Sequence, residues 1–480
     1  MNSQAFNPYL PEGKFFPDGE PHVFGDRLYV YCSQDKFGSG RFCAGDYEVW
    51  SAPLNDLSAW SCKKTALPRK NKFNRSGFKC MWAPDCTRGA DGNYYLYFCF
   101  GFENRICVAK SAMPDGPFEI IGCVRHSDGR PYGKARGDVM CFDPAVFTDD
   151  DGVTYLYSGF SPRGLIKFGL KLKGLKNVKS CGGQAMKLKG DMLTIDGEPQ
   201  PGVPGCANSA GTGFEGHEFY EASSMRKAGG RYYFIYSTIN SHELAYATAK
   251  TPLGPFSYGG VIISNGDFGV GRDPAAAKTY WGNNHGSMEF IGGQAYIFYH
   301  RQTNKNEQTR QGCAERITIA PDGKIAQAEM TSCGLNGGPL EGSGTYPAYI
   351  ACNLRSAAGA CKCAYGPAHR WRYSEHPCIT MEDGRQFIQN MRRGGVAVFR
   401  YFDVKSLESV SATVRGGEGA IEMFADGAEE PFAKIPIHKE DSWTEFSAAC
   451  SLSDGVHSLE LTYNGEGACD VLDFTLNAKK

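Results

Sequence analysis

The sequence predicts an all-β protein in which a five-bladed β-propeller is followed by a β-sandwich domain of jelly-roll type. Three observations predict this fold class. A strand motif rich in tyrosine recurs along the first two thirds of the chain. Aromatic residues make up 13% of the 480 residues and glycines number 60, which favours short strands joined by tight turns. The repeat then stops, and alternating strands of another kind follow.

The repeated motif is a turn followed by a strand of aromatic and aliphatic residues. Its five copies are DRLYVYC from Asp26, GNYYLYF from Gly92, GVTYLYS from Gly152, GRYYFIYS from Gly230 and GQAYIFYH from Gly293. Successive copies begin roughly 60 to 80 residues apart, which is room for about four short strands and their loops, or one propeller blade. Five copies between residues 7 and 335 indicate five blades. The alternative is a β-sandwich built from repeated hairpins.

An ionisable residue precedes four of the five motifs at nearly the same distance. Asp18 and His285 lie eight residues before their motifs, and Asp143 and Glu221 lie nine residues before theirs. The second copy has the segment WAPDC, with Trp82, at this place. Because equivalent positions on the innermost strands of successive blades converge on the propeller axis, the spacing predicts that these side chains meet in one central site.

Each of these residues also has a simpler interpretation. Asp18 in Pro-Asp-Gly suits a turn, and Asp143 before a proline suits a turn cap. Glu221 suits a surface carboxylate, and His285 suits a histidine of the core. The shared offset across the repeats favours the common site over these separate explanations. Glu20, in the same PDGEP stretch as Asp18, is predicted to be a turn residue.

Facing carboxyl groups in a pocket suit the hydrolysis of glycosidic bonds. One carboxylic acid protonates the leaving oxygen, and the other activates water or attacks the sugar. A third carboxylate nearby raises the pKa of the acid and keeps it protonated near neutral pH. Four aromatic residues close to these positions are predicted to line the sugar site, namely Phe16, Trp82, Phe142 and Tyr220.

The remainder of the chain is predicted to form a second domain. The segment TSCGLNGGPLEGSGTYP, at residues 331–347, is rich in glycine and lacks the repeat. Alternating strands such as VAVFRYFDV and HSLELTYNG follow it. We therefore expect a propeller over residues 1–335, a linker over 336–345 and a β-sandwich over 346–480.

Composition limits the partners and the compartment. Lys plus Arg number 51 and Asp plus Glu number 52, so there is no basic field to bind nucleic acid or an anionic membrane. The N-terminus, MNSQAFNPYL, lacks the basic and apolar regions of a signal peptide, which favours a cytoplasmic protein. The 19 cysteines lack zinc-binding spacing and are expected to be free thiols. No feature predicts the oligomeric state.

Several segments together resemble glycoside hydrolase family 43, over roughly residues 7–340. They are NPYLP, PDGEPHVFGDRLYVYCSQD, MWAPDC, FDPAVFTDDDG, FYEASSMRK, GNNHGS, YHRQTN and RQGCAE. The resemblance implies a five-bladed propeller, in agreement with the repeat. It also implies an inverting hydrolase that acts on glycans containing arabinose or xylose and that requires no cofactor.

The resemblance also implies roles for particular residues. Asp18 is expected to be the general base that activates water, and Glu221 the general acid. Asp143 is expected to orient Glu221 and raise its pKa. His285 matches a histidine near the propeller axis, often close to a bound calcium ion in this family. Arg310 is expected to face the pocket, with Trp82 lining the sugar site.

The last part of the chain resembles a family 6 carbohydrate-binding module in QFIQNMRRGGVAVFRYFDV and CDVLDFTLN. It departs from that pattern at Gly394-Gly395-Val396, where an aromatic residue is usual, and at Cys469-Asp470, where the strand usually begins with Asn. Packing against the propeller is therefore as well supported as sugar binding. Trp371, Tyr373 and Trp443 are expected to be core residues, with an aromatic platform for sugar as the alternative.

The favoured activity is the exo-acting release of terminal α-L-arabinofuranosyl units from oligosaccharides derived from arabinoxylan or arabinan. The alternatives with the same site are a β-D-xylosidase and a β-D-galactofuranosidase. A propeller that binds sugar without catalysis is a further alternative. The string GRDP at 271–274 resembles a motif of retaining fructan hydrolases, but it follows Glu221 in the chain, which is the wrong order for that group.

Overall fold

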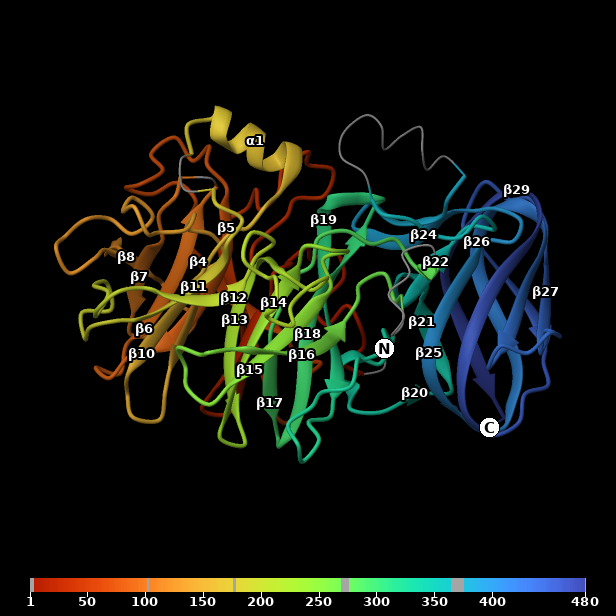
Figure 1. Ribbon diagram of the computed structural model, residues 1–480. Helices are drawn as coiled ribbons and strands as arrows, with labels where there is room; N and C mark the ends of the chain where they lie inside the picture. Colours follow the sequence, from red (N-terminus) through yellow and green to blue (C-terminus); the bar gives the residue numbers. More distant parts are fainter. Residues whose placement is uncertain (1–3, 102, 176–177, 269–275, 364–374, 480) are drawn as a thin grey trace.

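The computed structural model describes residues 4–101, 103–175, 178–268, 276–363 and 375–479 (Figure 1). The GRDP string, Trp371 and Tyr373 lie outside these residues. Among the elements of the described residues, helix α1 (Gly164–Leu172) and the short 3-10 turns η2 (Gly334–Asn336) and η3 (Ala348–Ile350) are helical, and the remaining named elements are β-strands. The predicted all-β class is therefore confirmed.

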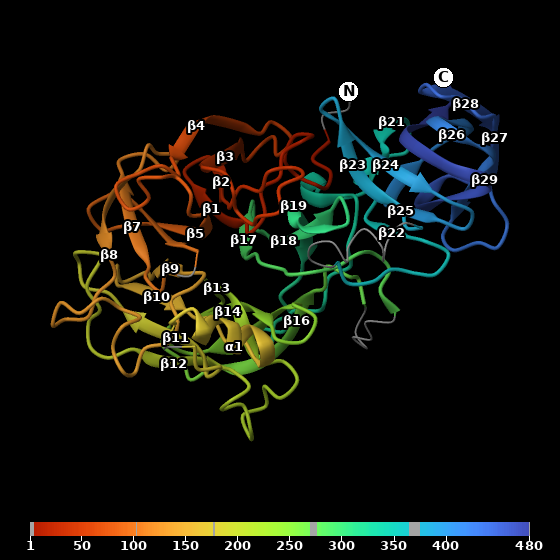
Figure 2. The same ribbon diagram turned by 90° about the horizontal axis from the view of Figure 1, so that it is seen from above.

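Five antiparallel sheets form the blades of a propeller (Figures 1 and 2). Blade 1 contains β1 (Glu20–Phe24), β2 (Arg27–Tyr31), β3 (Tyr47–Pro53) and β4 (Ser61–Leu67). Blade 2 contains β5 (Met81–Arg88), β6 (Tyr94–Phe100), β7 (Cys107–Ser111) and β8 (Glu119–Cys123). Blade 3 contains β9 (Ala145–Thr148), β10 (Thr154–Ser158), β11 (Gly182–Lys187) and β12 (Gln200–Pro204). Blade 4 contains β13 (Phe219–Ala228), β14 (Arg231–Thr238), β15 (Leu244–Ala249) and β16 (Ser257–Ile263), and blade 5 contains β17 (Met288–Ile291), β18 (Gln294–Thr303) and β19 (Asn306–Ile317).

The first strand of each blade lies next to the axis. β1 contacts both β5 and β17, β5 contacts β9, and β9 contacts β13. The five tyrosine-rich motifs form the second strands, β2, β6, β10, β14 and β18. The predicted five-bladed propeller is therefore confirmed, with one motif in each blade.

The N-terminal segment closes the ring by lying along the last strand of blade 5. The backbone N–H of Tyr9 donates to the carbonyl of Gly312 (3.2 Å). The side-chain amide of Asn7 donates to the carbonyl of Ala314 (2.9 Å) and to Glu315 Oε1 (3.0 Å). The beginning of the propeller is thereby tied to its end.

The C-terminal part is one ten-stranded sheet that fits a β-sandwich. Its strands are β20 (Leu340–Glu341), β21 (Gly344–Pro347), β22 (Asn353–Arg355), β23 (Cys378–Glu382), β24 (Arg385–Met391), β25 (Val396–Val404), β26 (Leu407–Ala425), β27 (Ala433–Ile437), β28 (Thr444–Ala449) and β29 (Gly455–Ala478). Aromatic rings such as Phe399, Phe402 and Phe474 pack at its centre. The strand β20 and the beginning of β21 fall within the segment that the sequence predicts as a linker.

The sandwich and the propeller share buried contacts. Cys352, Val396 and Val398 of the sandwich belong to the same apolar cluster as Tyr299 and Cys313 of blade 5. The two parts are therefore packed together and are not merely tethered (Figure 1).

Buried arginines cross the same boundary. Arg301 in β18 donates to the carbonyls of Ala351 (2.9 Å) and Tyr349 (2.6 Å). Arg400 in β25 donates to Asp267 Oδ2 (3.1 Å) and to the carbonyl of Met330 (2.9 Å). These bonds fix the orientation of one part relative to the other.

All 19 cysteines are free thiols and none is exposed, as small apolar groups of a core would be. Within the described residues, no helix is long and apolar enough to cross a membrane.

Candidate active site

A pocket of about 210 Å³ lies where the first strands of the blades converge. Eight of the residues singled out from the sequence line it, namely Asp18, Trp82, Phe142, Asp143, Tyr220, Glu221, His285 and Arg310. Eight others also line it, namely Phe42, Cys43, Ala83, Phe160, Ile166, His242, Asn283 and Lys362. The offset shared by the repeats therefore brings its four ionisable residues into one place.

Phe16 is the exception among the aromatic residues proposed to line the pocket. It is 1% exposed and packs edge-on against Trp50, with ring centres 5.7 Å apart, in the core of blade 1. Phe16 was predicted to line the pocket because it lies only two residues before Asp18 in the sequence. Asp18 has a φ of 60°, which breaks the alternation of an extended chain and turns Phe16 away.

Local backbone irregularities aim the three carboxyl groups at the pocket. Asp18 and Asp143 lie two residues before β1 and β9 and have φ values of 60° and 42°. Glu221 lies in β13, where the pairing with β14 shifts between Glu221 and Ser224 and Ala222 has a φ of 63°. Non-glycine residues with positive φ are strained, and they persist where the surrounding structure holds them. Bulges of this kind re-aim side chains.

Asp18 is held in its ionised form by Arg310. Arg310 Nη1 lies 3.0 Å from Asp18 Oδ1, and the same guanidinium forks onto Asp35 through Nε (2.8 Å) and Nη2 (3.0 Å). Burial alone would raise the pKa of Asp18, but the positive charge of Arg310, with a smaller contribution from His285, outweighs burial and lowers it. Asp18 is therefore a carboxylate.

His300 lies beside Asp18 as an uncharged hydrogen-bond partner. Its Nδ1 accepts the backbone N–H of Asp18 (3.3 Å), and its Nε2 donates to the carbonyl of Asn283 (2.9 Å). Burial, together with the positive charge of Arg310, lowers the pKa of His300 to about 3. His300 is therefore a neutral imidazole whose tautomer is set by its two partners.

The surroundings of Glu221 shift its pKa in the opposite direction. Burial raises this pKa well above the usual value, and the negative charge of Asp143 raises it further. His242 Nδ1 lies 3.9 Å from Glu221 Oε1, and burial, with the charge of Lys362, lowers the pKa of His242 to about 3. The environment of Glu221, which includes a neutral histidine, therefore favours the carboxylic acid form.

Asp143 and Glu20 lie on opposite sides of His285. His285 Nδ1 is 3.5 Å from Asp143 Oδ2, and His285 Nε2 is 3.5 Å from Glu20 Oε1. Burial would lower the pKa of His285, but the two carboxyl groups raise it well above the usual value. Asp143 Oδ2 also accepts the backbone N–H of Ala222 (3.1 Å), next to Glu221. Glu20, the first residue of β1 and 1% exposed, is thus a buried partner of the site, and the prediction of a turn residue is wrong.

A chain of aromatic rings forms one wall of the pocket. The ring centres lie 5.1 Å apart between Trp82 and Phe142, 4.7 Å between Phe142 and Phe160, and 5.2 Å between Phe160 and Tyr220. Such faces suit the apolar side of a sugar ring. Lys362, from the C-terminal part of the chain, contributes to the lining as well.

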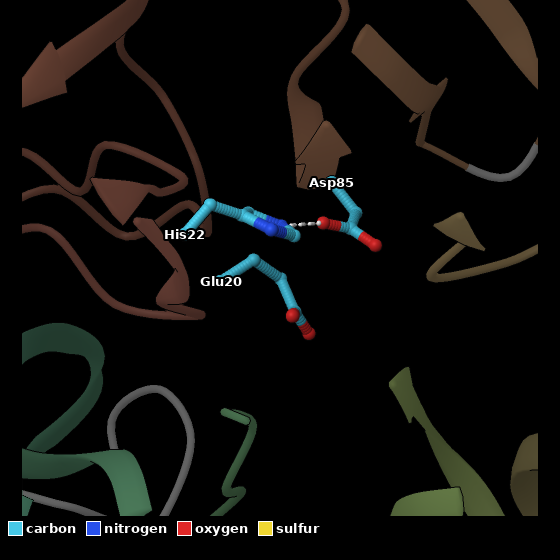
Figure 3. Close-up of side chains that lie close together, drawn as sticks. All are labelled: Glu20, His22 and Asp85. Carbon is cyan, nitrogen blue, oxygen red and sulfur yellow. Dashed lines mark hydrogen bonds and ion pairs between the residues drawn. The ribbon is translucent and has the colours of Figure 1, made fainter. Parts of the chain in front are cut away.

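One group of metal-ligating side chains also lies near the axis. Figure 3 shows Glu20 and His22 from β1 and Asp85 from β5 converging, with one ligand atom from each within 4.8 Å of the others. His22 Nε2 is already hydrogen-bonded to Asp85 Oδ1 (2.7 Å), and Arg226 Nη2 lies 3.2 Å from Glu20 Oε2. Calcium takes about six to eight oxygen ligands. Here Asp85 is hydrogen-bonded to His22, and Glu20 pairs with the Arg226 guanidinium through one oxygen, so this group does not supply the oxygen ligands of a calcium site. His285, the other candidate metal ligand, has carboxyl groups near both ring nitrogens, Asp143 at Nδ1 and Glu20 at Nε2.

Several site residues escaped the sequence analysis. Asp35 follows the first tyrosine-rich motif, and His300 is the last residue of the fifth. In an antiparallel hairpin, the end of the second strand lies beside the beginning of the first. The ends of the first and fifth motifs therefore carried a signal that the offset before each motif did not use. Nothing in the local sequence of His242, Ile166 or Lys362 points to the pocket.

Comparison with known proteins gives the family. The family model described as glycosyl hydrolases family 43 matches residues 8–325. A protein of Thermoclostridium stercorarium named xylosidase/arabinosidase is 45% identical over 485 aligned positions, covering 99% of both chains. A family 43 β-xylosidase/α-arabinofuranosidase from a compost microbial metagenome, solved with xylotriose in a calcium-free form, is 26% identical with a TM-score of 0.50, covering 66% of this chain and 96% of that one. An arabinoxylan arabinofuranohydrolase of Bacillus subtilis, 20% identical with a TM-score of 0.51, shares the fold over 99% of this chain and 98% of its own.

The match of the family model and the likeness along nearly the whole chain agree with the three carboxyl groups in the propeller pocket. The chain belongs to glycosyl hydrolase family 43 and is a glycosidase that hydrolyses O-glycosyl bonds.

Proposed function

We propose that the protein is an inverting, exo-acting α-L-arabinofuranosidase that acts on oligosaccharides derived from arabinoxylan or arabinan. In this proposal Asp18 is the general base, Glu221 is the general acid, and Asp143 orients Glu221 and keeps it protonated. The observation that carries the proposal is that Asp18, beside the Arg310 guanidinium, and Glu221, buried beside Asp143, line one pocket with pKa values shifted in opposite directions. Catalysis by an acid and a base requires that difference.

The reaction follows from these protonation states. Glu221 gives its proton to the glycosidic oxygen as the bond from that oxygen to the anomeric carbon breaks. Asp18 takes a proton from a water molecule, and the water oxygen bonds to the anomeric carbon from the opposite face. The sugar leaves with an inverted anomeric centre. Glu221 then regains a proton, and Asp18 releases one.

The size of the pocket supports exo action. Its volume of about 210 Å³ lies below the range of about 300–1,000 Å³ that holds drug-sized ligands. A pocket of this size suits one terminal sugar unit better than the interior of a polymer. The aromatic wall from Trp82 to Tyr220 would contact the face of that sugar.

A β-D-xylosidase with the same site is the second candidate. The Thermoclostridium stercorarium relative and the compost enzyme are each named for both activities. The two substrates differ in ring size, and the residues that discriminate between them would lie in the aromatic wall. Nitrophenyl α-L-arabinofuranoside and β-D-xyloside, compared by kcat/KM, separate the two candidates.

The mechanism is tested by Asp18→Ala and Glu221→Ala. Each is expected to lower kcat about 100- to 10,000-fold, the usual contribution of a general acid or base, with the circular dichroism spectrum unchanged. The matched control is Glu315→Gln, since Glu315 is a buried carboxyl group of blade 5, outside the pocket, whose pKa burial raises to about 8. Full activity in either pocket variant would end the proposal.

The stereochemical course is tested separately by proton NMR of the first-formed anomer. An inverted product supports Asp18 as a base acting on water. A retained product would make Asp18 a nucleophile instead.

A further inference from the structure

The propeller axis contains a buried arginine that the proposed reaction does not use. Arg226 lies on β13, five residues after Glu221, and is 7% exposed. Its Nη2 donates to Glu20 Oε2 (3.2 Å) and to the carbonyl of Pro21 (2.7 Å), and its Nη1 donates to the carbonyl of Met225 (2.8 Å). The guanidinium therefore joins the inner strands of blades 1 and 4.

Arg226 occupies the place among the acidic groups where a bound cation would act. Its Nη2 is 3.5 Å from His22 Nε2, and His22 is one of the three side chains in Figure 3. Its Nε is 3.9 Å from Glu289 Oε2 in β17. Arginine stays charged in proteins. A divalent ion bound to Glu20 would lie against this permanent positive charge.

A chain of ionic contacts leads from Arg226 to the proposed catalytic groups. Arg226 contacts Glu20, Glu20 Oε1 lies 3.5 Å from His285 Nε2, and His285 Nδ1 lies 3.5 Å from Asp143 Oδ2. The Ser224 hydroxyl, from the same strand as Arg226, lies 3.0 Å from Glu20 Oε2. Glu20 is therefore held on one oxygen by β13 and faces His285 with the other.

We propose that Arg226 is the built-in cation of the propeller axis, a positioning residue that holds Glu20 and, through it, His285 and Asp143, so that the enzyme works without a bound metal ion. The effect on catalysis rests on the proposed function, because it acts through Asp143 on Glu221. The metal independence does not, because it depends only on which cation occupies the axis.

The first experiment measures metal content and stability of the wild-type chain. After treatment with EDTA and desalting, we expect less than about 0.1 calcium per chain by mass spectrometry, and the same melting temperature with and without 5 mM calcium chloride. Stoichiometric calcium, or a melting temperature that falls on chelation and returns with calcium, would overturn the proposal. This result does not depend on the roles of Asp18 and Glu221.

The second experiment compares Arg226→Met, Arg226→Lys and the control Arg400→Met. Arg400 is matched because it is also buried and pairs with carboxyl groups, Asp267 and Glu329, away from the pocket. Outer partners of a functional site typically contribute about 10- to 100-fold to activity. We expect Arg226→Met to lower kcat by that factor with KM within threefold, and Arg226→Lys to restore most of it.

The response to calcium distinguishes positioning from general stability. Arg226→Met removes the fixed cation and leaves Glu20 facing His22 and Asp85, so we expect added calcium to raise its melting temperature. Arg400→Met and wild type are expected to show no such rise. If Arg226→Met does not fold, Arg226→Lys must still be calcium-insensitive and active. The positioning role would be refuted if the kcat of Arg226→Met equalled that of wild type. It would also be refuted if added calcium raised the melting temperature of Arg226→Met, Arg400→Met and wild type alike.

Discussion

At the scale of single residues, two carboxyl groups in one pocket have pKa values shifted in opposite directions because their charged neighbours differ. Both are buried, which raises the pKa of each. The Arg310 guanidinium lies 3.0 Å from Asp18, whereas the charged group with the largest effect on the pKa of Glu221 is Asp143. The sign of the charge that acts most strongly on each group therefore sets the direction in which its pKa moves, which is the difference that the proposed acid and base roles need.

The pH profile follows from these directions. The proposed mechanism requires Asp18 ionised and Glu221 protonated, so kcat/KM is expected to fall as the pH drops through the lowered pKa of Asp18 and as it rises through the raised pKa of Glu221. Asp143→Asn removes a negative charge beside Glu221. The pKa of Glu221 then falls, and the basic limb is expected to move down by about one pH unit. The acid limb, which reports Asp18, is the internal control and should stay in place. A basic limb that does not move would show that Asp143 does not raise the pKa of Glu221.

The fork between Arg310 and Asp35 gives a prediction about stability. Asp35→Ala leaves the buried guanidinium paired with Asp18 alone. Breaking a buried pair by removing one partner costs about 3–5 kcal/mol, so the free energy of unfolding in urea should fall by that amount. The control Lys405→Ala removes an exposed pair with Asp403 and should cost less than about 1 kcal/mol. Equal losses in both variants would mean that the fork adds nothing.

At the scale of elements, the sequence predicted the strands better than their irregularities. Alternation and tyrosine content indicated the second strand of each blade, because these strands are regular. The positive φ values at Asp18, Asp143 and Ala222 follow no local pattern, since tertiary contacts hold non-glycine residues in that conformation. The inner strands could therefore be located from the sequence, but the direction of side chains such as Phe16 could not.

The helix α1 shows the same limit and yields a prediction. It is inserted between β10 and β11, and its Ile166 lines the pocket although the helix lies on the surface (Figure 1). Ile166→Ala is expected to raise KM several-fold with kcat within threefold, because a side chain that only contacts substrate changes uniform binding. Leu165→Ala, on the same helix and 88% exposed, is the matched control and should leave both constants unchanged. The same KM in the two variants would exclude α1 from substrate binding.

At the scale of the whole molecule, the C-terminal part contributes to the pocket as well as to the fold. Lys362 pairs with Trp281 through backbone hydrogen bonds on either side, and its ammonium lies 5.2 Å from the centre of the Trp281 ring. Asn283 and His285 lie two and four residues after Trp281 in the chain and line the pocket. The segment that carries these two pocket residues is thus held at Trp281 by the C-terminal part. The sequence predicted two domains but not this contact, because it joins residues some 80 positions apart.

The sugar-binding role suggested for the C-terminal part has little support at the position that departs from the binding-module pattern. Arg415 donates to Asp470 Oδ2 (3.1 Å) and lies 4.5 Å from the centre of the Trp443 ring and 5.0 Å from that of Phe387. The aromatic faces there are covered by an arginine of the same chain. We therefore propose a structural role for this part of the protein.

A structural role predicts that both parts unfold together. Leu461 is fully buried in the core of the sandwich, outside the cluster shared with blade 5. Leu461→Ala is expected to cost about 2–5 kcal/mol, and to lower the temperature at which hydrolysis is lost by as much as it lowers the melting temperature. The reason is that Arg301, Arg400 and the shared apolar cluster couple the sandwich to blade 5.

Calorimetry should show one transition for wild type and variant. Two transitions, with activity surviving the one that Leu461→Ala lowers, would show that the sandwich unfolds without the propeller.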